Sequence, residues 1–253
     1  MEPLLGASLL AAATLAAAAP PMPLHSWSTV PTFQHLASVN ATLAQPFPPA
    51  RLRWLASTFP LVVMEHAQGM GEWAYSPPSG PGSVWGPRPF VPPVFIEEHF
   101  AAGAAAIKAL NASVVVLYYQ QITGALPYYR QSQPLMSHAG WALDDNCNPV
   151  TEDAGSAAAL GDILPNYVTY GYDHTQAGVT ENFVAAFLNM TGSTSVDGTF
   201  IDTAGCYDAP GQAAASLATV QAMQAARPDK IVGFHTQSAL SGANGFSAAM
   251  DYT

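Results

Sequence analysis

The stretch SVDGTFIDTAGCYD, residues 195–208, places two aspartates at the two ends of a short apolar run. The run between Asp197 and Asp202 has the composition of a buried strand, in which successive side chains point to opposite faces. Because their separation is odd, the two acids belong to opposite faces and do not form a catalytic pair. We expect Asp197, at the start, to satisfy backbone donors beside Gly198. Asp202 closes the strand at its carboxyl end, where the alternative role is to cap the following loop.

Outward from this strand, the chain alternates between strand-like and helix-like patterns. Compact apolar runs predict further strands at 59–66, 113–120, 166–173, 230–237 and 246–253. Helical patterns occupy 50–58, 97–111, 175–190 and 211–227, and Pro228 ends the last of them. Strands that alternate with helices predict βαβ units around a parallel sheet, and therefore the α/β class.

Two architectures fit this order, an open doubly wound sheet and a (β/α)8 TIM barrel. No G-x-G-x-x-G follows the first strand and no P-loop is present, so the nucleotide-binding forms lack support. Polar residues close the carboxyl ends of the predicted strands: Glu65, Gln120, Asp173, Asp202, His235 and Asp251. Barrel enzymes gather their active sites at that face, so we expect a TIM-barrel-like fold. Only about six strands are visible, which predicts a barrel truncated before its eighth strand.

The composition limits the partners. Of 253 residues, 49% are hydrophobic and 9% are charged, and 7 Lys and Arg stand against 17 Asp and Glu, for a net charge of -10. A nucleic-acid backbone needs basic residues to neutralise it, so we expect no nucleic-acid partner. With so few Lys and Arg residues, we also expect no polybasic patch that would bind a membrane surface. The length allows one large domain with its own core.

The N-terminus has the pattern of a secretory signal. The apolar block of residues 4–19 is too short to span a bilayer, and Ala17 and Ala19 form an Ala-x-Ala-like cleavage site. Because Glu2 takes the place of the usual basic residue, an apolar N-terminal anchor or a gene-prediction artefact is the alternative. We expect a signal peptide at 1–19, a Pro-rich extended lead-in at 20–50 and the incomplete barrel domain at 51–253. The mature protein would be secreted and free of the membrane.

Three sequons and two cysteines agree with secretion. Asn40, Asn111 and Asn189 each begin an Asn-x-Ser/Thr triplet, the acceptor of N-linked glycans. Cys147 and Cys206 form an even pair, which predicts one disulfide in an oxidising compartment. The alternative is two free thiols in a cytosolic chain.

Acids at the strand ends are the candidates for chemistry. In a barrel, the ends of the fourth and sixth strands face each other, which pairs Asp202 with Asp251. Two carboxyls about 5 Å apart fit retaining glycoside hydrolysis, and a wider gap fits inversion. Asp202 would be the nucleophile or charge stabiliser and Asp251 the general acid/base, with Asp173 and Glu65 positioning the substrate. Alternatively, Asp173 caps a helix and Glu65 pairs with a histidine as scaffold.

Aromatic and amide groups crowd the same loops and strand ends. Aromatic faces stack on sugars, whose hydroxyls need polar partners, so we expect Tyr119, Gln120, Trp141 and His235 to contact a carbohydrate. The alternative is that most of the rings pack in the core or the rim. The chain has no H-E-x-x-H or other metal-binding spacing and no G-x-S-x-G elbow. We therefore expect no metal and no cofactor.

Several blocks resemble a group of glycoside-hydrolase-like TIM-barrel proteins: FPLVVMEHAQG (59–69), AAIKALNASVVVLYYQQ (105–121), WALDDNCNPV (141–150), YDHTQAGVTENFVAAFLN (172–189) and VDGTFIDTA (196–204). The resemblance implies a barrel that acts on polysaccharide or descends from enzymes that do, with Asp202 as the acid that ends strand four. The placement of Asp202 and Asp251 is also similar to that in the α-galactosidase clan, with a nucleophile after strand four and an acid/base after strand six. Here FIDTAGC replaces the Lys-x-Asp-x-Cys run of that clan.

The sequence thus predicts a secreted glycosidase that hydrolyses a poly- or oligosaccharide through paired carboxylates. The first alternative is a non-catalytic or degenerate carbohydrate-binding barrel, which keeps the aromatic residues and needs no paired acids. A second is a non-glycosidic hydrolase or a metal enzyme.

Overall fold

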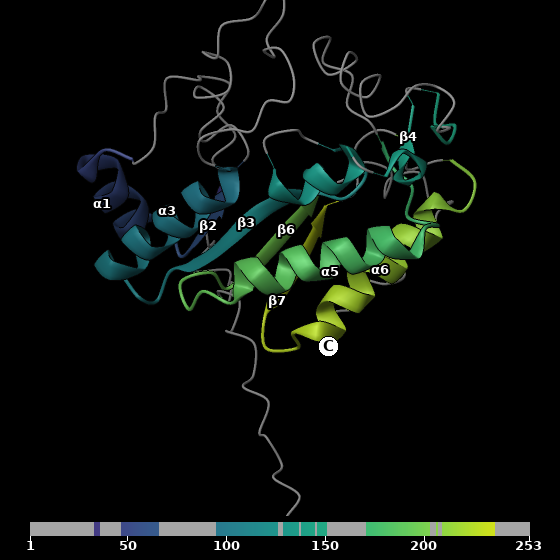
Figure 1. The fold of residues 1–253 in the computed structure, drawn as a ribbon. Coiled ribbons are helices and arrows are strands. Elements are labelled where there is room, and N and C mark those ends of the chain that lie inside the picture. Colours follow the sequence, from purple (N-terminus) through teal and green to yellow (C-terminus); the bar gives the residue numbers. More distant parts are fainter. Residues whose placement is uncertain are drawn as a thin grey trace, which may run out of the picture.

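Five parallel strands form the main sheet of the computed structural model, which describes residues 33–35, 47–65, 95–125, 129–136, 138–144, 146–150, 171–202, 206 and 209–235 (Figure 1). The strands are β1 (Phe33–His35), β2 (Leu61–Met64), β3 (Val115–Gln121), β6 (Gly198–Asp202) and β7 (Ile231–His235). Every neighbouring pair is parallel, and the spatial order is β1-β2-β3-β6-β7.

One long helix lies in each connection between neighbouring strands of this sheet. These helices are α1 (Pro49–Thr58), α3 (Ile96–Leu110), α5 (Ala177–Thr191) and α6 (Gln212–Ala226), each within two residues of its prediction. The order of the strands follows the chain without the reversal that marks a doubly wound sheet. The α/β class with a parallel sheet is therefore confirmed, and the described strands of this sheet are wound in one direction. Closure and truncation of a barrel stay predictions.

Two segments differ from the sequence-based expectation. The third predicted strand, 166–173, is described only from residue 171, where β5 (Gly171–Tyr172) pairs antiparallel with β4 (Ala142–Leu143) instead of joining the main sheet. Conversely, the predicted lead-in contributes β1, which pairs with β2. Three residues are too few to show an apolar pattern, so only their partner strand identifies them. The predicted signal peptide and the strand at 246–253 lie outside the described residues.

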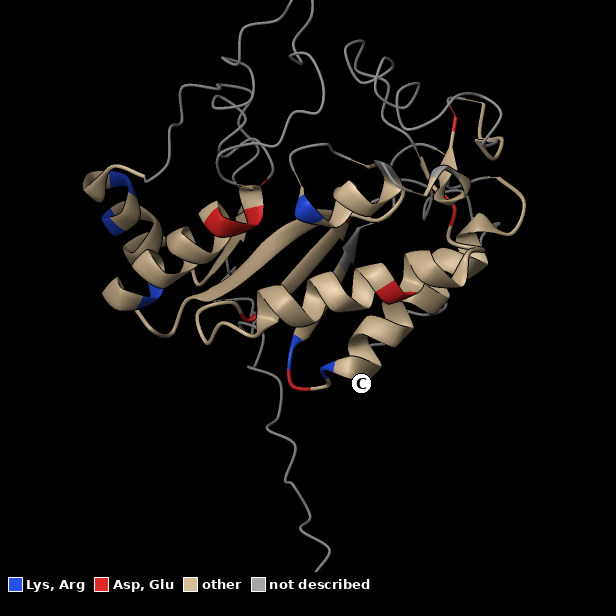
Figure 2. Ribbon diagram, viewed as in Figure 1, with Lys and Arg blue, Asp and Glu red and all other residues tan. Residues whose placement is uncertain are grey.

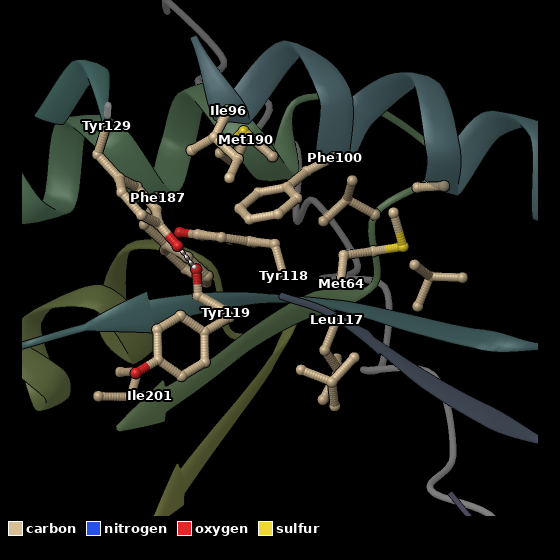
Figure 3. Packing of buried hydrophobic residues seen from close by; sticks show 14 of the residues in the cluster. Met64, Ile96, Phe100, Leu117, Tyr118, Tyr119, Tyr129, Phe187, Met190 and Ile201 are labelled. Carbon is tan, nitrogen blue, oxygen red and sulfur yellow. Dashed lines mark hydrogen bonds between the residues drawn. The ribbon is translucent and has the colours of Figure 1, made fainter. Parts of the chain in front are cut away.

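The main sheet has one face covered by helices. Met64 and Tyr118 point toward α3 and α5, whereas Leu117 and Tyr119 point away from these helices (Figure 3). Phe100 of α3 packs on Tyr118 with ring centroids 6.3 Å apart. Phe183 and Phe187 of α5 are fully buried in the same core. Alternate residues of β3 therefore serve two different environments, the helical core and the opposite face.

The amino-terminal end of β6 is pinned by the first of the two aspartates. Asp197 Oδ2 accepts a hydrogen bond of 2.8 Å from the Val116 backbone N–H and lies 2.6 Å from Lys108 Nζ. This confirms the expected structural role of Asp197, at the opposite end of β6 from Asp202. Charged residues elsewhere lie mainly near the ends of elements, and α6 carries none (Figure 2).

Two connected hydroxyls and a buried histidine hold α5 and α6 against the end of β3. His174 Nε2 donates to the Ile122 carbonyl at 2.6 Å, so the neutral ring accepts at Nδ1 from Thr219 Oγ1, 2.9 Å away. Thr180 Oγ1 lies 2.8 Å from Thr219 Oγ1 and continues the chain into α5. Burial lowers the pKa of His174 to about 4, against the opposing effects of the Ile122 carbonyl and Asp173.

Substituting Gly198 tests the close packing of β6 on β7. A Cβ at this position would overlap the backbone carbonyl of Ile231, which cannot move without breaking the sheet. We expect G198A to lower the free energy of unfolding by at least about 1–3 kcal/mol, measured by urea denaturation. Gly233 is the matched control, because its nearest atom would be 3.6 Å away. Equal losses in G198A and G233A would contradict this packing.

Acid titration tests the neutral state of His174. In the unfolded chain the imidazole of His174 becomes protonated near pH 6.5, whereas in the folded chain its pKa is about 4. Between these pH values the unfolded state binds more protons than the folded state. The stability that the neutral His174 contributes is therefore fully present above pH 6.5 and is lost as the pH falls toward 4. The contribution amounts to about 3 kcal/mol at most. Urea denaturation at several pH values measures the free energy of unfolding. We expect H174Q to reduce its dependence on pH between 4 and 6.5, and an unchanged dependence would contradict the neutral state of His174.

Candidate functional site

Three neighbouring strands bring polar groups together at the carboxyl edge of the sheet. Glu65 directly follows β2, Tyr119 lies in β3 and Asp202 closes β6. Tyr119 Oη donates a hydrogen bond of 2.9 Å to Asp202 Oδ2. Since Tyr119 pairs in register with Phe200, Asp202 is its diagonal neighbour two residues further along the same face. The site thus lies on the face turned away from α3 and α5 (Figure 3).

The electrostatic environment keeps the Tyr119 hydroxyl protonated. Burial raises the pKa of Tyr119 far above its ordinary value, and the charge of Asp202, the hydrogen bond to it and the charge of Glu65 raise it further. Glu65 and Tyr119 are both almost completely buried, whereas Asp202 is partly exposed. The neutral Tyr119 hydroxyl therefore lies close enough to the carboxyl groups of Asp202 and Glu65 for both to affect its pKa. It orients the Asp202 carboxylate, which remains accessible at the edge.

Gln121 lies directly opposite Asp202 on the neighbouring strand β3, and the sequence interpretation missed it. The register pairs Gln121 with Asp202 and Asp202 with His235 across three adjacent strands. Gln120, the predicted substrate contact, instead faces the helices and is completely buried. Its amide donates to Gln131 Oε1 at 2.6 Å, and its oxygen accepts from Tyr118 Oη at 3.2 Å. Counting by two from Tyr119 would have selected Gln121 rather than Gln120.

Asp173 belongs to a turn before α5 rather than to the edge of the main sheet. Its carboxylate accepts from the Thr175 backbone at 3.0 Å and from Gln212 Nε2 at 2.7 Å, which joins the starts of α5 and α6. Burial acts to raise the pKa of Asp173, but hydrogen bonds from Thr175, Gln212 and Gln176 outweigh it and lower the pKa. The carboxylate thus serves the turn that links the two helices, whereas the N-cap of α5 is Gln176, which makes no side-chain cap bond.

Trp141 packs at the side of the helix rather than beside Asp202. It ends the short 3-10 helix η2 (Ala139–Trp141), and its ring stacks on His138 with centroids 4.4 Å apart. The ring also lies against Gly178 of α5, where any side chain would collide with it. Trp141 is partly buried, in keeping with the alternative that the aromatic residues pack at the rim.

The predicted disulfide joins the segment after β6 to the segment after β4. Cys147 and Cys206 are bonded with their Cα atoms 5.2 Å apart, across 59 residues of sequence. Cys206 also packs beside Gly171 of β5, where an added Cβ would lie 3.2 Å from the Cys206 sulfur. A crosslink over a loop of this length typically stabilises a fold by about 2–4 kcal/mol. Here it anchors the chain four residues beyond Asp202 to the small β4–β5 sheet.

Several predicted site residues are not tested by this geometry. Asp251 and Asn40 lie outside the described residues, as does the side chain of His235, although its backbone pairs with Asp202. Asn111 and Asn189 are described, at the end of α3 and in the last turn of α5.

The described part of the chain also bears on metal binding and on membranes. Within those ranges, no group of three or more His, Cys, Asp or Glu side chains could hold a metal ion. None of the described helices combines the length and apolarity that crossing a membrane requires.

No protein-family model and no curated protein matches the sequence. Among solved structures, the chain is similar to a maltogenic α-amylase from Thermotoga neapolitana (17% identity, 74% of this chain and 39% of that one, TM-score 0.41). It is also similar to an α-amylase from Geobacillus thermoleovorans (9% identity, 75% and 40%, TM-score 0.41). A third structure is the type III pullulan hydrolase from Thermococcus kodakarensis (10% identity, 81% and 36%, TM-score 0.40). The chain thus spans well under half of each of these proteins, and similarity at this level assigns it to no family.

Proposed function

We propose that the chain is a secreted glycoside hydrolase that cleaves glycosidic bonds of a poly- or oligosaccharide. The observation that carries this proposal is the bond from Tyr119 Oη to Asp202 Oδ2 at the carboxyl edge, with the Glu65 carboxyl close enough to act on the same hydroxyl. Glycoside hydrolysis needs a carboxylate held in place beside an oxocarbenium-like centre, together with a second acid. The winding of the sheet supports a TIM-barrel domain with this site at the face where barrel enzymes work.

In the proposed reaction, Asp202 is the nucleophile or charge stabiliser. On a retaining route its carboxylate bonds to the anomeric carbon while the bond to the leaving oxygen breaks and a general acid protonates that oxygen. Water then cleaves the glycosyl-enzyme. Asp251 remains our candidate for the acid/base, and Glu65 positions substrate through the Tyr119 hydroxyl. On an inverting route Asp202 stabilises the developing positive charge without a covalent bond.

Replacing Asp202 tests this role. We expect D202N to lower kcat by at least about 10³-fold, because the carboxylate is required only in the transition state. Activity would be measured on a glycan panel, with binding measured on the same glycans. Asp197 is the matched control on the same strand, since it serves the structure at the other end. We expect D197N to lose stability but to keep the turnover of its folded fraction.

The outcomes separate the readings of the site. Unchanged turnover in D202N would remove Asp202 from the reaction. Glycan binding without turnover by the unaltered protein would favour the non-catalytic carbohydrate-binding barrel. If the unaltered protein retains the anomeric configuration and D202A, rescued by added azide, yields a glycosyl azide of inverted configuration, Asp202 is the nucleophile of a retaining reaction.

A pair of adjacent tyrosines tests the orienting bond. Y119F removes the donor to Asp202 and should lower kcat about 10-fold with little change in KM, since orientation of the carboxylate matters most in the transition state. Y118F is the control, because that hydroxyl faces the helical core and bonds Gln120. We expect Y118F to lower the free energy of unfolding by about 1 kcal/mol in urea denaturation and to leave the turnover unchanged. If Y119F keeps the wild-type kcat, the orienting role is excluded.

A further inference from the structure

A groove separate from the carboxyl edge lies between α1 and α3. It has a volume of about 520 Å³ and is lined by Arg53, Trp54, Ala56, Ser57, Leu110 and Asn111. Asn111 caps the end of α3 just before β3 begins, so the groove lies by the amino-terminal edge of the sheet. Asp202 lies at the opposite edge, and the groove therefore belongs to a different site.

The groove presents exposed apolar side chains beside polar ones. Among the described residues, Trp54 and Leu110 have 47% and 51% of their surface exposed, which makes them two of the three exposed large hydrophobic side chains. The Trp54 ring is held by an edge-to-face contact with Phe59, with centroids 5.0 Å apart. Arg53 adds an exposed cation whose guanidinium can donate to ligand oxygens. An oriented indole beside a donor suits the apolar face and polar rim of a sugar.

Asn111 at the wall of this groove begins one of the three sequons. Its Oδ1 accepts hydrogen bonds from the Ser113 hydroxyl at 2.7 Å and the Ser113 backbone at 3.1 Å. Its Nδ2 donates to the Ala56 carbonyl of α1 at 2.9 Å. A glycosylated amide keeps one N–H, so this contact can persist after modification. The side chain that would carry a glycan is therefore aimed along the α1 side of the groove.

The second described sequon is placed differently. Asn189 lies in the last turn of α5, and its partner Thr191 is buried and donates to the Phe187 carbonyl at 2.6 Å. The Ser113 hydroxyl of the Asn111 sequon is instead exposed and bonds the acceptor asparagine itself. The groove adjoins Asn111, which therefore has a surface beside it on which an attached sugar can lie.

We propose that Asn111 carries an N-linked glycan and that its first N-acetylglucosamine lies in the α1–α3 groove against Trp54. The transfer joins Asn111 Nδ2 to the anomeric carbon of a lipid-diphosphate-linked oligosaccharide, breaks the bond from that carbon to the diphosphate and releases one amide proton. The attached sugar then covers Trp54 and Leu110 and clamps α1 to α3. This proposal needs the chain to enter the secretory pathway, and it does not depend on catalysis at Asp202.

The test is a cycle of four full-length proteins secreted from a eukaryotic cell: the unaltered chain, N111Q, W54A and W54A/N111Q. Peptide mass spectrometry measures the occupancy of Asn111, and thermal unfolding measures Tm. We expect an occupied Asn111, and N111Q should lower Tm by about 2–4 °C when Trp54 is present. In the W54A background, N111Q should lower Tm by much less.

Leu188 is the matched control, because it is an exposed hydrophobic residue of α5 away from the groove. L188A should leave the effect of N111Q on Tm unchanged. W54A and W54A/N111Q both lack the contact between Trp54 and Phe59. The cost of losing this contact therefore cancels when the Tm values of these two proteins are compared. An Asn111 without glycan, or an N111Q effect of equal size with and without Trp54, overturns the proposal.

Discussion

The pairing of β3 with β6 is the constraint on which both the fold and the candidate site depend. Side-chain hydrogen bonds join these strands in the middle, from Thr199 to the Tyr118 carbonyl, and beside each end of β6. Asp197 Oδ2 accepts from the Val116 backbone at 2.8 Å, and Tyr119 Oη donates to Asp202 Oδ2 at 2.9 Å. The Asp197 bond is beside Lys108 and fixes where the strand starts. A slip of one residue would turn Asp202 toward the helices and separate it from Tyr119.

Much of this arrangement follows from alternation in the sequence, because a strand exposes every second side chain to the same surroundings. The odd separation of Asp197 and Asp202 predicted that they do not act as a pair, and the structure gives Asp197 the expected bond to backbone. The four long helices were also predicted, since their apolar periodicity extends over many residues. The same rule, applied between Tyr119 and the next residues, favours Gln121 at the edge. Choosing Gln120 by its place after an apolar run ignored this rule, and Gln120 proved to be buried against Gln131.

Other features could not be predicted because tertiary contacts decide them. The third sequence-predicted strand has no parallel partner in the described residues, and Gly171–Tyr172 pairs with Ala142–Leu143 instead. The first strand of the sheet, Phe33–His35, is recognised only by its pairing with β2. Among the described strands of the main sheet, Asp202 therefore ends the fourth. The position of Asp173 was open for a similar reason, because its partner Gln212 is distant in sequence.

The two edges of the sheet have different physical demands, and the chain meets them with different residues. At the amino-terminal edge, Asp197 is paired with Lys108 and bonded to backbone, which lowers the cost of burying a charge. At the carboxyl edge, Glu65 is buried just after β2, and Asp202 accepts a hydrogen bond from the Tyr119 hydroxyl. In a chain with only 9% charged residues, these two acids and the Tyr119 hydroxyl on the strand between them are the feature on which the proposed glycoside hydrolysis rests.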